Sequence, residues 1–286
     1  MKFTKLLSPQ CIELHGKPAS KTEVIRRLMD LLMKSGKISD RKAFEAAVFE
    51  REWQGSTGVG DGIGIPHGKS AGVRELVLSA MVIPGGTDFQ AIDGMPVDLL
   101  FMIVAPDDGG DMHLHMLSRI SSYLLQEEFT RSLRHAATAA EFLRIFEQAE
   151  EKEAITERKE KSPQTEVARV LAVTDCHMGL VHTCMAAESL RQKAYQMGIP
   201  FKVETNGIGM VRNRLTQKEI QACDGIILAT DVPLDLRRFE GKNLLRTSSV
   251  QAIGQPEALL RGILDWKTSA HRGEYRRNIP YYKEKK

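Results

Sequence analysis

The stretch ARVLAVTDCHMGLVHT, residues 168–183, decides the fold of the second half of the chain. Residues 168–173 form a short apolar run, which predicts a buried strand. The polar, glycine-containing residues 174–183 then predict a turn, and a helix is expected from about Thr183 to Met197. A strand, a turn and a helix in this order are the start of an α/β unit.

The rest of the second half continues this alternation. Residues 201–204 and 225–229 predict two more strands, and Thr216-Gln217-Lys218-Glu219 predicts a capping box that starts the helix between them. Pro256 opens a last helix at the position that proline favours. Because strands joined by helices usually run parallel, we expect a small Rossmann-like parallel sheet with helices on both faces.

Cys176 is the candidate nucleophile of this half, since it directly follows the first predicted strand. A loop that leads into a helix N-terminus can surround a tetrahedral anion with backbone amides, and the same field favours the thiolate. Open α/β sheets also bind ligands at this carboxyl edge. The alternative interpretation is a buried structural cysteine.

Two other chemistries for this loop are weaker. A zinc site made of Cys176, His177 and His182 would crowd its ligands into one tight loop. A low-molecular-weight phosphatase needs an arginine at the end of the loop, where this chain has His182. The remaining cysteines show no CxxC spacing and are expected to be buried or without chemistry: Cys11, Cys184 and Cys223.

The first half holds a glycine-rich segment, STGVGDGIGIPHG, at residues 56–68. Its glycines allow the backbone to approach a ligand closely, and its amides can form an anion-binding nest. His67, between proline and glycine, offers a neutral, nucleophilic imidazole at cytoplasmic pH. Arg51, His113 and His115 are further candidates to contact the anion. A glycine-rich surface turn with an incidental histidine is the alternative, and the segment fits neither a Walker loop nor a dinucleotide site.

Helix and strand patterns surround this segment. Capping signals at Ser20, Asp40 and Thr138 each predict a helix, and another amphipathic helix is expected over 113–125. Two strands with Pro-Gly-Gly between them are predicted at 77–83 and 97–104. We therefore expect an α/β domain with a mixed sheet flanked by helices.

The composition fits a globular protein of about two domains, with 286 residues, of which 42% are hydrophobic and 27% charged. The N-terminus lacks the apolar core of a signal peptide, and no apolar run approaches the ~20 residues of a membrane span, so we expect a cytoplasmic protein. Residues 267–286 carry a net charge of +5, whereas the whole chain carries +3, so the first 266 residues carry about −2. The nearly neutral remainder argues against nucleic-acid binding.

A highly charged stretch, residues 147–166, separates the two halves. It contains eleven charged residues and a Ser-Pro, which favour a solvated linker that continues from the end of a helix. The predicted limits are an N-terminal domain at 1–148, a charged linker at 149–166, a C-terminal domain at 167–266 and a basic tail at 267–286.

On these residues the chain resembles the bacterial phosphoenolpyruvate:sugar phosphotransferase system. Residues 1–148 resemble a fructose/mannitol-type enzyme IIA domain on four segments: Arg51-Glu52, Ser56-Thr57-Gly58, Ile65-Pro66-His67-Gly68 and His113-Leu114. Residues 167–266 resemble a fructose-type enzyme IIB domain on Val173-Thr174, Cys176, Gly179, His182-Thr183, Met185–Glu188, Val203–Gly207 and Asp231–Arg238. Two independent motif sets in the order of the family make the resemblance specific.

The resemblance implies a phosphotransferase that accepts a phosphoryl group from the phosphocarrier protein HPr and passes it to a fructose-like sugar. His67 would accept the group first, and Cys176 would take it next. The residues implied to stabilise the group are Arg51, Thr57 and His113 in the first domain and Gly179, His182 and Thr183 in the second. Neither a metal ion nor a cofactor is implied. A membrane-embedded enzyme IIC on a separate chain would present the sugar.

The loop around Cys176 departs from the family pattern. His177-Met178 stand where the family usually has Pro-Thr, and a carboxylate at Asp175 opposes thiolate formation. Whether this loop slows the second transfer, which sugar is used and how many chains assemble are left open. The basic tail either rests on the anionic inner face of the membrane or is solvated. The competing function is a regulatory protein that uses the same phosphorylation as a signal.

Overall fold

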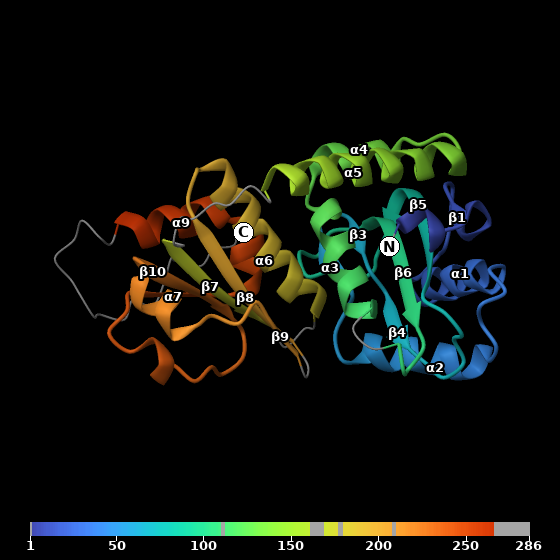
Figure 1. The fold of residues 1–286 in the computed structure, drawn as a ribbon. Helices are drawn as coiled ribbons and strands as arrows, with labels where there is room; N and C mark the ends of the chain where they lie inside the picture. The colour runs from blue at the N-terminus through green and yellow to red at the C-terminus, as the bar shows by residue number, and fades with distance from the viewer. Residues whose placement is uncertain (1, 110–111, 161–168, 177–179, 208–209, 266–286) are drawn as a thin grey trace, which may run out of the picture. The chain divides into compact units, whose positions relative to one another are not determined.

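The computed structural model describes residues 2–109, 112–160, 169–176, 180–207 and 210–265 (Figure 1). The chain divides into two compact units, 1–163 and 164–286. Each unit contains its own sheet, one mixed and one mainly parallel. The α/β class predicted for both halves is confirmed.

The sheet of the first unit has the strand order β1-β5-β6-β3-β2, with β4 also paired to β6. Its long central strands, β5 and β6, are antiparallel, whereas β3 and β4 run parallel to β6. The strands are β1 (Ile12–Glu13), β2 (Gly58–Gly60), β3 (Ile63–Gly64), β4 (His67–Lys69), β5 (Val77–Thr87) and β6 (Val97–Ala105).

Strand β6 is buried on both faces, which explains its continuous apolar sequence. Leu100 belongs to the hydrophobic cluster that includes helix α1 (Lys21–Met33). The next side chain, Phe101, points to the opposite face of the sheet. There its ring contacts Phe146 of helix α5 (Ala139–Glu160).

The capping signals of the sequence are found at the expected helix starts. The Ser20 side chain accepts a hydrogen bond from the backbone of Glu23, and Asp40 does the same at the start of α2 (Arg41–Trp53). Thr138 Oγ1 accepts from the backbone of Glu141 at 3.1 Å, before α5. Two further helices contact β6: α3 (Met112–Leu124) and α4 (Glu127–Arg134).

Two elements of the first unit differ from the sequence prediction. Strand β5 does not end at Ile83 but continues through Pro84-Gly85-Gly86 to Thr87, with an irregular register after Val82. Gly85 and Gly86 have φ values of 89° and 70°, so this irregularity depends on glycine.

Helix α5 continues to Glu160, through most of the stretch predicted as a charged linker. The alternating Glu, Lys, Arg and Ala residues there have high helix propensity, which explains the longer helix. The last part of the predicted linker, 161–166, and the basic tail lie outside the described residues. The predicted domain limits remain predictions.

The second unit has the strand order β11-β10-β7-β8-β9, in which only the edge strand β9 is antiparallel among the described strands. The chain starts at β7, adds β8 on one side and β10 on the other. The strands are β7 (Val170–Asp175), β8 (Phe201–Gly207), β9 (Met210–Arg212), β10 (Gly225–Thr230) and β11 (Leu244–Thr247).

Helices cover both faces of this sheet, as predicted. One hydrophobic cluster joins the sheet to α6 (Leu180–Gln196), α8 (Ser249–Gly254) and α9 (Pro256–Asp265). A separate cluster joins the other face to α7 (Gln217–Ala222), whose capping box at Thr216 is formed. Figure 1 shows these helices on both sides of the strands.

Helix α6 begins at Leu180, three residues earlier than the predicted start at Thr183. The buried side chains of Val181, Cys184 and Met185 recur at helical spacing, which extends the buried face one turn toward the N-terminus. His182 and Thr183 therefore lie in the first turn of the helix and not in the loop before it. Across the described part of the chain, no helix has both the length and the apolar character of a membrane span.

Candidate functional site

His67 is the first residue of β4, and a neighbouring glycine brings helix α2 close to it. β4 lies beside β6, with His67 opposite Ile103. A Cβ atom added at Gly68 would lie 3.1 Å from Cγ2 of Val48 on α2, so glycine permits this close packing. Arg51 lies one turn after Val48 on the same face of the helix. The close packing of α2 on β4 thus places the Arg51 guanidinium at the His67 ring.

The contacts of the His67 ring define its tautomer. Nδ1 lies 2.7 Å from the carbonyl oxygen of Ile65, which can only accept, so Nδ1 carries the proton. Arg51 Nε donates to Nε2 at 3.1 Å, so Nε2 holds the lone pair. The ring is 6% exposed. His67 therefore presents a nucleophilic Nε2 directly against a cation.

Arg51 is fixed as well as charged. Its Nη1 donates to the carbonyl oxygen of Gly55 at 3.0 Å, while its Nε contacts His67. Burial lowers the pKa of Arg51, and the neighbouring Glu52 carboxylate acts in the opposite direction. A guanidinium stays protonated despite such a shift, because it loses its proton only far above neutral pH. A partly buried cation of this kind can bind a phosphoryl oxygen.

His113 lies beside His67, with 5.8 Å between their ring centroids. Burial and, to a smaller extent, the positive charge of Lys69 lower the pKa of His113 to about 4. The ring is therefore neutral near pH 7. Its buried Nδ1 has no hydrogen-bond partner among the described residues. His115, the other candidate on helix α3, has an exposed side chain.

Thr57 contacts the site through a carboxylate. Its backbone N–H and its hydroxyl donate to the two oxygens of Glu52, at 2.9 Å and 2.6 Å. Lys21 forms an ion pair with the same carboxylate at 2.7 Å. Glu52 thus anchors the glycine-rich segment to α2, next to Arg51. The sequence placed Glu52 only inside a matching motif, and its partner Lys21 gave no signal because it lies on another helix.

Cys176 directly follows β7 at the point where the order of strands reverses. β7 lies between β8 and β10, and the backbone N–H of Asp231, after β10, donates to the carbonyl of Asp175 at 3.0 Å. Ligands of open α/β sheets bind at this kind of position. The Cys176 side chain is 7% exposed, and its Sγ lies 3.2 Å from Oγ of Ser249.

The environment of Cys176 contains two carboxylates. Burial raises the pKa of Asp175, a backbone hydrogen bond from Cys176 opposes this, and the negative charge of Asp231 adds to the rise. The Ser249 hydroxyl is hydrogen-bonded to Asp231, whose Oδ2 also accepts from the backbone N–H of Ser249 at 3.2 Å. The sequence analysis missed Ser249, because it predicted neither the strand before this residue nor the helix that begins with it.

Of the other predicted residues of the second site, two are described by the structure and two are not. His182 and Thr183 are buried in the first turn of α6. Gly179 and His177 lie outside the described residues. Within the described ranges, no three His, Cys, Asp or Glu side chains are grouped as metal ligands.

Cys184 and Cys223 are buried, as predicted, and Cys11, for which the sequence predicted no chemistry, is buried as well. Cys11 lies 3.3 Å from the carbonyl of Leu31, and Cys223 lies 3.1 Å from that of Ile220. Burial raises the pKa of the Cys223 thiol. A thiol in such surroundings is a poor nucleophile.

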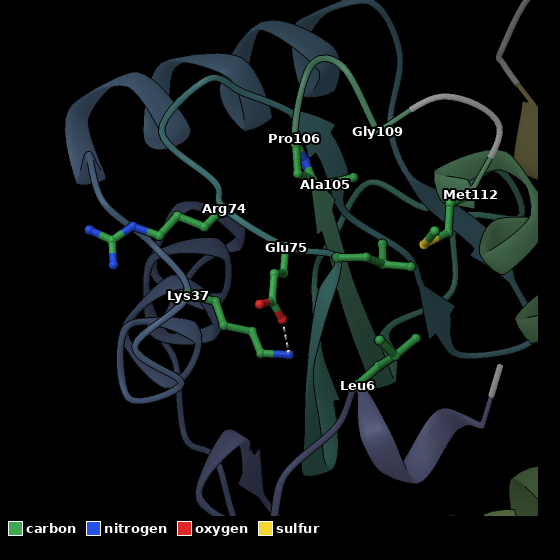
Figure 2. A pocket seen from close by; sticks show the side chains of 9 residues that line it. Leu6, Lys37, Arg74, Glu75, Ala105, Pro106, Gly109 and Met112 are labelled. Carbon is green, nitrogen blue, oxygen red and sulfur yellow. Dashed lines mark ion pairs between the residues drawn. The ribbon is translucent and has the colours of Figure 1, made fainter.

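A mainly apolar pocket lies near the start of helix α3 (Figure 2). Leu6, Leu76 and Met112 contribute apolar side chains to it. Lys37 and Glu75 form an ion pair at 3.0 Å on its wall. Neither His67 nor Cys176 lines this pocket, so both candidate nucleophiles lie outside it.

Comparisons with known proteins identify both halves. Residues 5–149 match the family described as phosphoenolpyruvate-dependent sugar phosphotransferase system, EIIA 2. Residues 171–261 match the family described as PTS system, lactose/cellobiose specific IIB subunit.

Three relatives illustrate the similarity. The fructose-specific EIIABC component of the PTS system from Bacillus subtilis is 35% identical over 275 residues, which are 96% of this chain and 43% of that protein. The fructose-specific EIIA component from Haloferax volcanii is 41% identical, over 44% of this chain and 82% of that protein. A nitrogen regulatory protein from Klebsiella oxytoca is 34% identical, over 52% of this chain and 92% of that protein. The chain spans about two fifths of the length of the EIIABC relatives that it matches.

Proposed function

The chain belongs to the phosphoenolpyruvate-dependent sugar phosphotransferase system, as an EIIA domain followed by a IIB domain, and on this premise we propose that it relays a phosphoryl group from phospho-HPr through His67 and then Cys176 to a sugar. The sugar is fructose-like, in keeping with the fructose-specific relatives. It is presented by a membrane enzyme IIC.

The geometry of the His67 ring carries this proposal. The Ile65 carbonyl holds the proton on Nδ1, so Nε2, which accepts a hydrogen bond from Arg51, has the lone pair that attacks the phosphorus atom of phospho-HPr. The P–N bond to the carrier breaks as the P–N bond to Nε2 forms. The Nδ1–H bond remains. The phosphorylated ring acquires a positive charge, which is stabilised by the hydrogen bond from Nδ1–H to the Ile65 carbonyl oxygen.

Arg51 and His113 have separate tasks in this step. The Arg51 guanidinium, already at Nε2, moves its hydrogen bond from the ring nitrogen to a phosphoryl oxygen. His113 is neutral before the transfer and has a buried nitrogen ready for a partner. A dianion nearby raises the pKa of an imidazole, so the arriving group favours the protonated His113 ring, in which both nitrogens donate hydrogen bonds. Thr57 acts through Glu52, which keeps the glycine-rich segment in position.

Cys176 then takes the phosphoryl group. The sulfur attacks the phosphorus of phospho-His67, the P–N bond breaks and an S–P bond forms. The N-terminus of α6, a helix of seventeen residues, supplies backbone amides and a positive field for the dianion. His182 and Thr183 lie in that first turn, so both contribute amides. Catalysis here consists of positioning and charge stabilisation.

Labelling with phosphoenolpyruvate, enzyme I and HPr tests the proposal. The wild-type chain should carry acid-labile phosphate on His67 and phosphate on Cys176. The Cys176→Ser variant should retain the first label and lose sugar phosphorylation. His67→Ala should lose both labels, whereas the matched control His115→Ala, with its exposed ring, should behave as wild type. Undiminished labelling of His67→Ala would refute the relay.

A regulatory role is the second candidate, and a specific similarity favours it. Nitrogen regulatory proteins from three organisms match about half of this chain and at least 90% of their own lengths. In this case phosphorylation of His67 would alter binding to another protein. The discriminating result is a phosphorylated chain that passes nothing to sugar with membranes containing an enzyme IIC, yet changes its affinity for a partner.

A further inference from the structure

Three side chains from different elements of the second unit form a continuous hydrogen-bonded chain. Cys176 follows β7, Ser249 opens α8 and Asp231 follows β10. The Cys176 Sγ lies 3.2 Å from Ser249 Oγ, and the same hydroxyl is bonded to Asp231 Oδ2. Ser249 is fully buried.

The direction of these bonds follows from what each group can donate. A serine hydroxyl has one proton, and an ionised carboxylate can only accept. The Ser249 hydroxyl therefore donates to Asp231, where the Ser249 backbone N–H donates as well. The Ser249 oxygen is then left to accept the S–H proton of Cys176. The chain runs from thiol to hydroxyl to carboxylate.

We propose that Asp231, acting through Ser249, accepts the proton of Cys176 when the thiol attacks phosphohistidine, and returns it when the thiolate leaves. The inference rests on the proposed function, because it concerns the second transfer of the same relay. Ser249 contacts the reacting sulfur, and Asp231 is a positioning residue that acts through it.

The step balances in atoms and charge. As the S–P bond forms and the P–N bond breaks, the thiol proton passes to Ser249, and the Ser249 proton passes to Asp231. The products are phosphocysteine, neutral His67 with its Nδ1 proton, and a protonated Asp231. In the next transfer an O–P bond to the sugar hydroxyl forms as the S–P bond breaks. The hydroxyl proton is released to solvent, and the stored proton returns from Asp231 through Ser249 to the sulfur.

The charges around Cys176 favour this assignment. Asp175 and Asp231 lie close enough for the charge of Asp231 to raise the pKa of Asp175. A phosphoryl dianion on the sulfur adds further negative charge, which favours a proton on one carboxylate. Asp175 is hydrogen-bonded to the Cys176 backbone, whereas Asp231 is connected to the thiol itself. Other titratable or charged groups near this end of the sheet are His182 in the first turn of α6, Glu204 opposite Val173 with its ion-pair partner Arg238, and Arg246 opposite Leu228.

Single-turnover transfer from phospho-His67 to Cys176 tests the inference in three variants. Ser249→Ala and Asp231→Asn should slow the transfer about 10- to 30-fold, since only a few per cent of an ordinary thiol is ionised at neutral pH. Ser249→Thr keeps the hydroxyl and should recover most of the rate. Ser189→Ala is the matched control, because its hydroxyl donates to the Ile253 carbonyl at 2.9 Å and not to the thiol.

Alkylation of unphosphorylated Cys176 by iodoacetamide separates the relay from simple positioning. Asp231→Asn removes a negative charge near the thiol, which lowers the thiol pKa, so alkylation should be as fast as wild type or faster while transfer is slower. Parallel losses of alkylation and transfer would overturn the relay, and so would transfer at the wild-type rate in both variants. Absence of phosphate on Cys176 in the wild-type chain would instead refute the proposed function.

Infrared difference spectra give a second test, which detects the transferred proton directly in the wild-type chain. Phosphorylation of Cys176 should produce the carbonyl band of a protonated carboxylic acid. The band should be missing in Asp231→Asn and present in Ser189→Ala. A phosphocysteine form without that band would contradict proton storage on Asp231.

Discussion

The reactivity of His67 depends on which atom each ring nitrogen contacts. A backbone carbonyl at 2.7 Å fixes the proton on Nδ1, and Arg51 Nε at 3.1 Å identifies Nε2 as the lone-pair nitrogen. The histidine thus needs no neighbouring base to become nucleophilic. In the proposed transfer it needs a cation that moves its hydrogen bond from the ring nitrogen to a phosphoryl oxygen, and Arg51, which contacts both His67 and Gly55, fits that role.

Replacing Arg51 tests this at the scale of one residue. Arg51→Lys keeps the charge but loses the planar guanidinium, which donates hydrogen bonds to His67 and to Gly55 at the same time. We expect phosphorylation of His67 to slow about tenfold or more, which corresponds to the ~1.5 kcal/mol of one charge-assisted hydrogen bond. Stopped-flow or rapid-quench rates measure it, with Arg41→Lys on the same helix as control. Equal rates in the two variants would remove Arg51 from the step.

His113 gives a pH prediction for stability. Its pKa is about 4 in the folded chain and 6.5 in the unfolded chain, so between these values the unfolded chain binds more protons. Stability is therefore lost as the pH falls from 6.5 toward 4, by about 2 kcal/mol at pH 5 from this residue. Urea unfolding at pH 7 and pH 5 measures the loss, which should be smaller in His113→Gln. An identical pH dependence in the variant would show that His113 is not buried neutral.

The sequence singled out candidate site residues only where the local pattern around them is unusual. His67 between Pro66 and Gly68, and Cys176 after an apolar run, stand out without a structure. The pairing of Ser249 with Asp231 does not, because 18 residues separate these positions, and 73 separate Ser249 from Cys176. Such contacts come from the order of strands in the sheet, which no local pattern contains.

At the scale of elements, the first site depends on how closely α2 packs on β4. Gly68 is the contact point, with Val48 atoms at 3.1–3.4 Å from the position of an added Cβ. Both Val48 and Arg51 lie on the face of α2 that meets the strand. A displacement of the helix by a few tenths of an ångström therefore moves the guanidinium relative to Nε2.

Gly68→Ala should reveal this dependence. The added methyl group should cost about 1–3 kcal/mol by overpacking, and it should slow phosphorylation of His67 because Arg51 is displaced. Unfolding in urea and rapid-quench rates would be measured on the same samples. The control is Gly254→Ala, where an added Cβ meets no atom within 4 Å. A variant that loses stability but phosphorylates normally would disconnect helix packing from the chemistry.

The sequence predicted long elements better than short ones. Helices with capping residues and the central strands β5, β6, β7 and β10 have clear patterns, and their types were correct. Strands β1 to β4 contain two or three residues each, too few for any periodicity. Strand β11 and helix α8 were also missed, so the residue at the start of α8 could not be placed beside Cys176.

At the scale of the whole molecule, the relay requires only that the two units meet with His67 and Cys176 facing each other. Mixing His67→Ala with Cys176→Ser tests this. The phosphorylated His67 of one chain should pass its group to Cys176 of the other, at a rate that rises with protein concentration. Site-resolved mass spectrometry would detect it. The His67→Ala variant alone should carry no phosphate on Cys176. Phosphate there would show that Cys176 has a different donor.

The most direct measurement of the central claim is the order in which the two residues become phosphorylated. A rapid-quench time course with phosphoenolpyruvate, enzyme I and HPr, read by site-resolved mass spectrometry, follows both at once. We expect phosphate to appear first on His67 and to decline there as it rises on Cys176. Phosphate that reaches Cys176 before His67, or at an unchanged rate in His67→Ala, would contradict it.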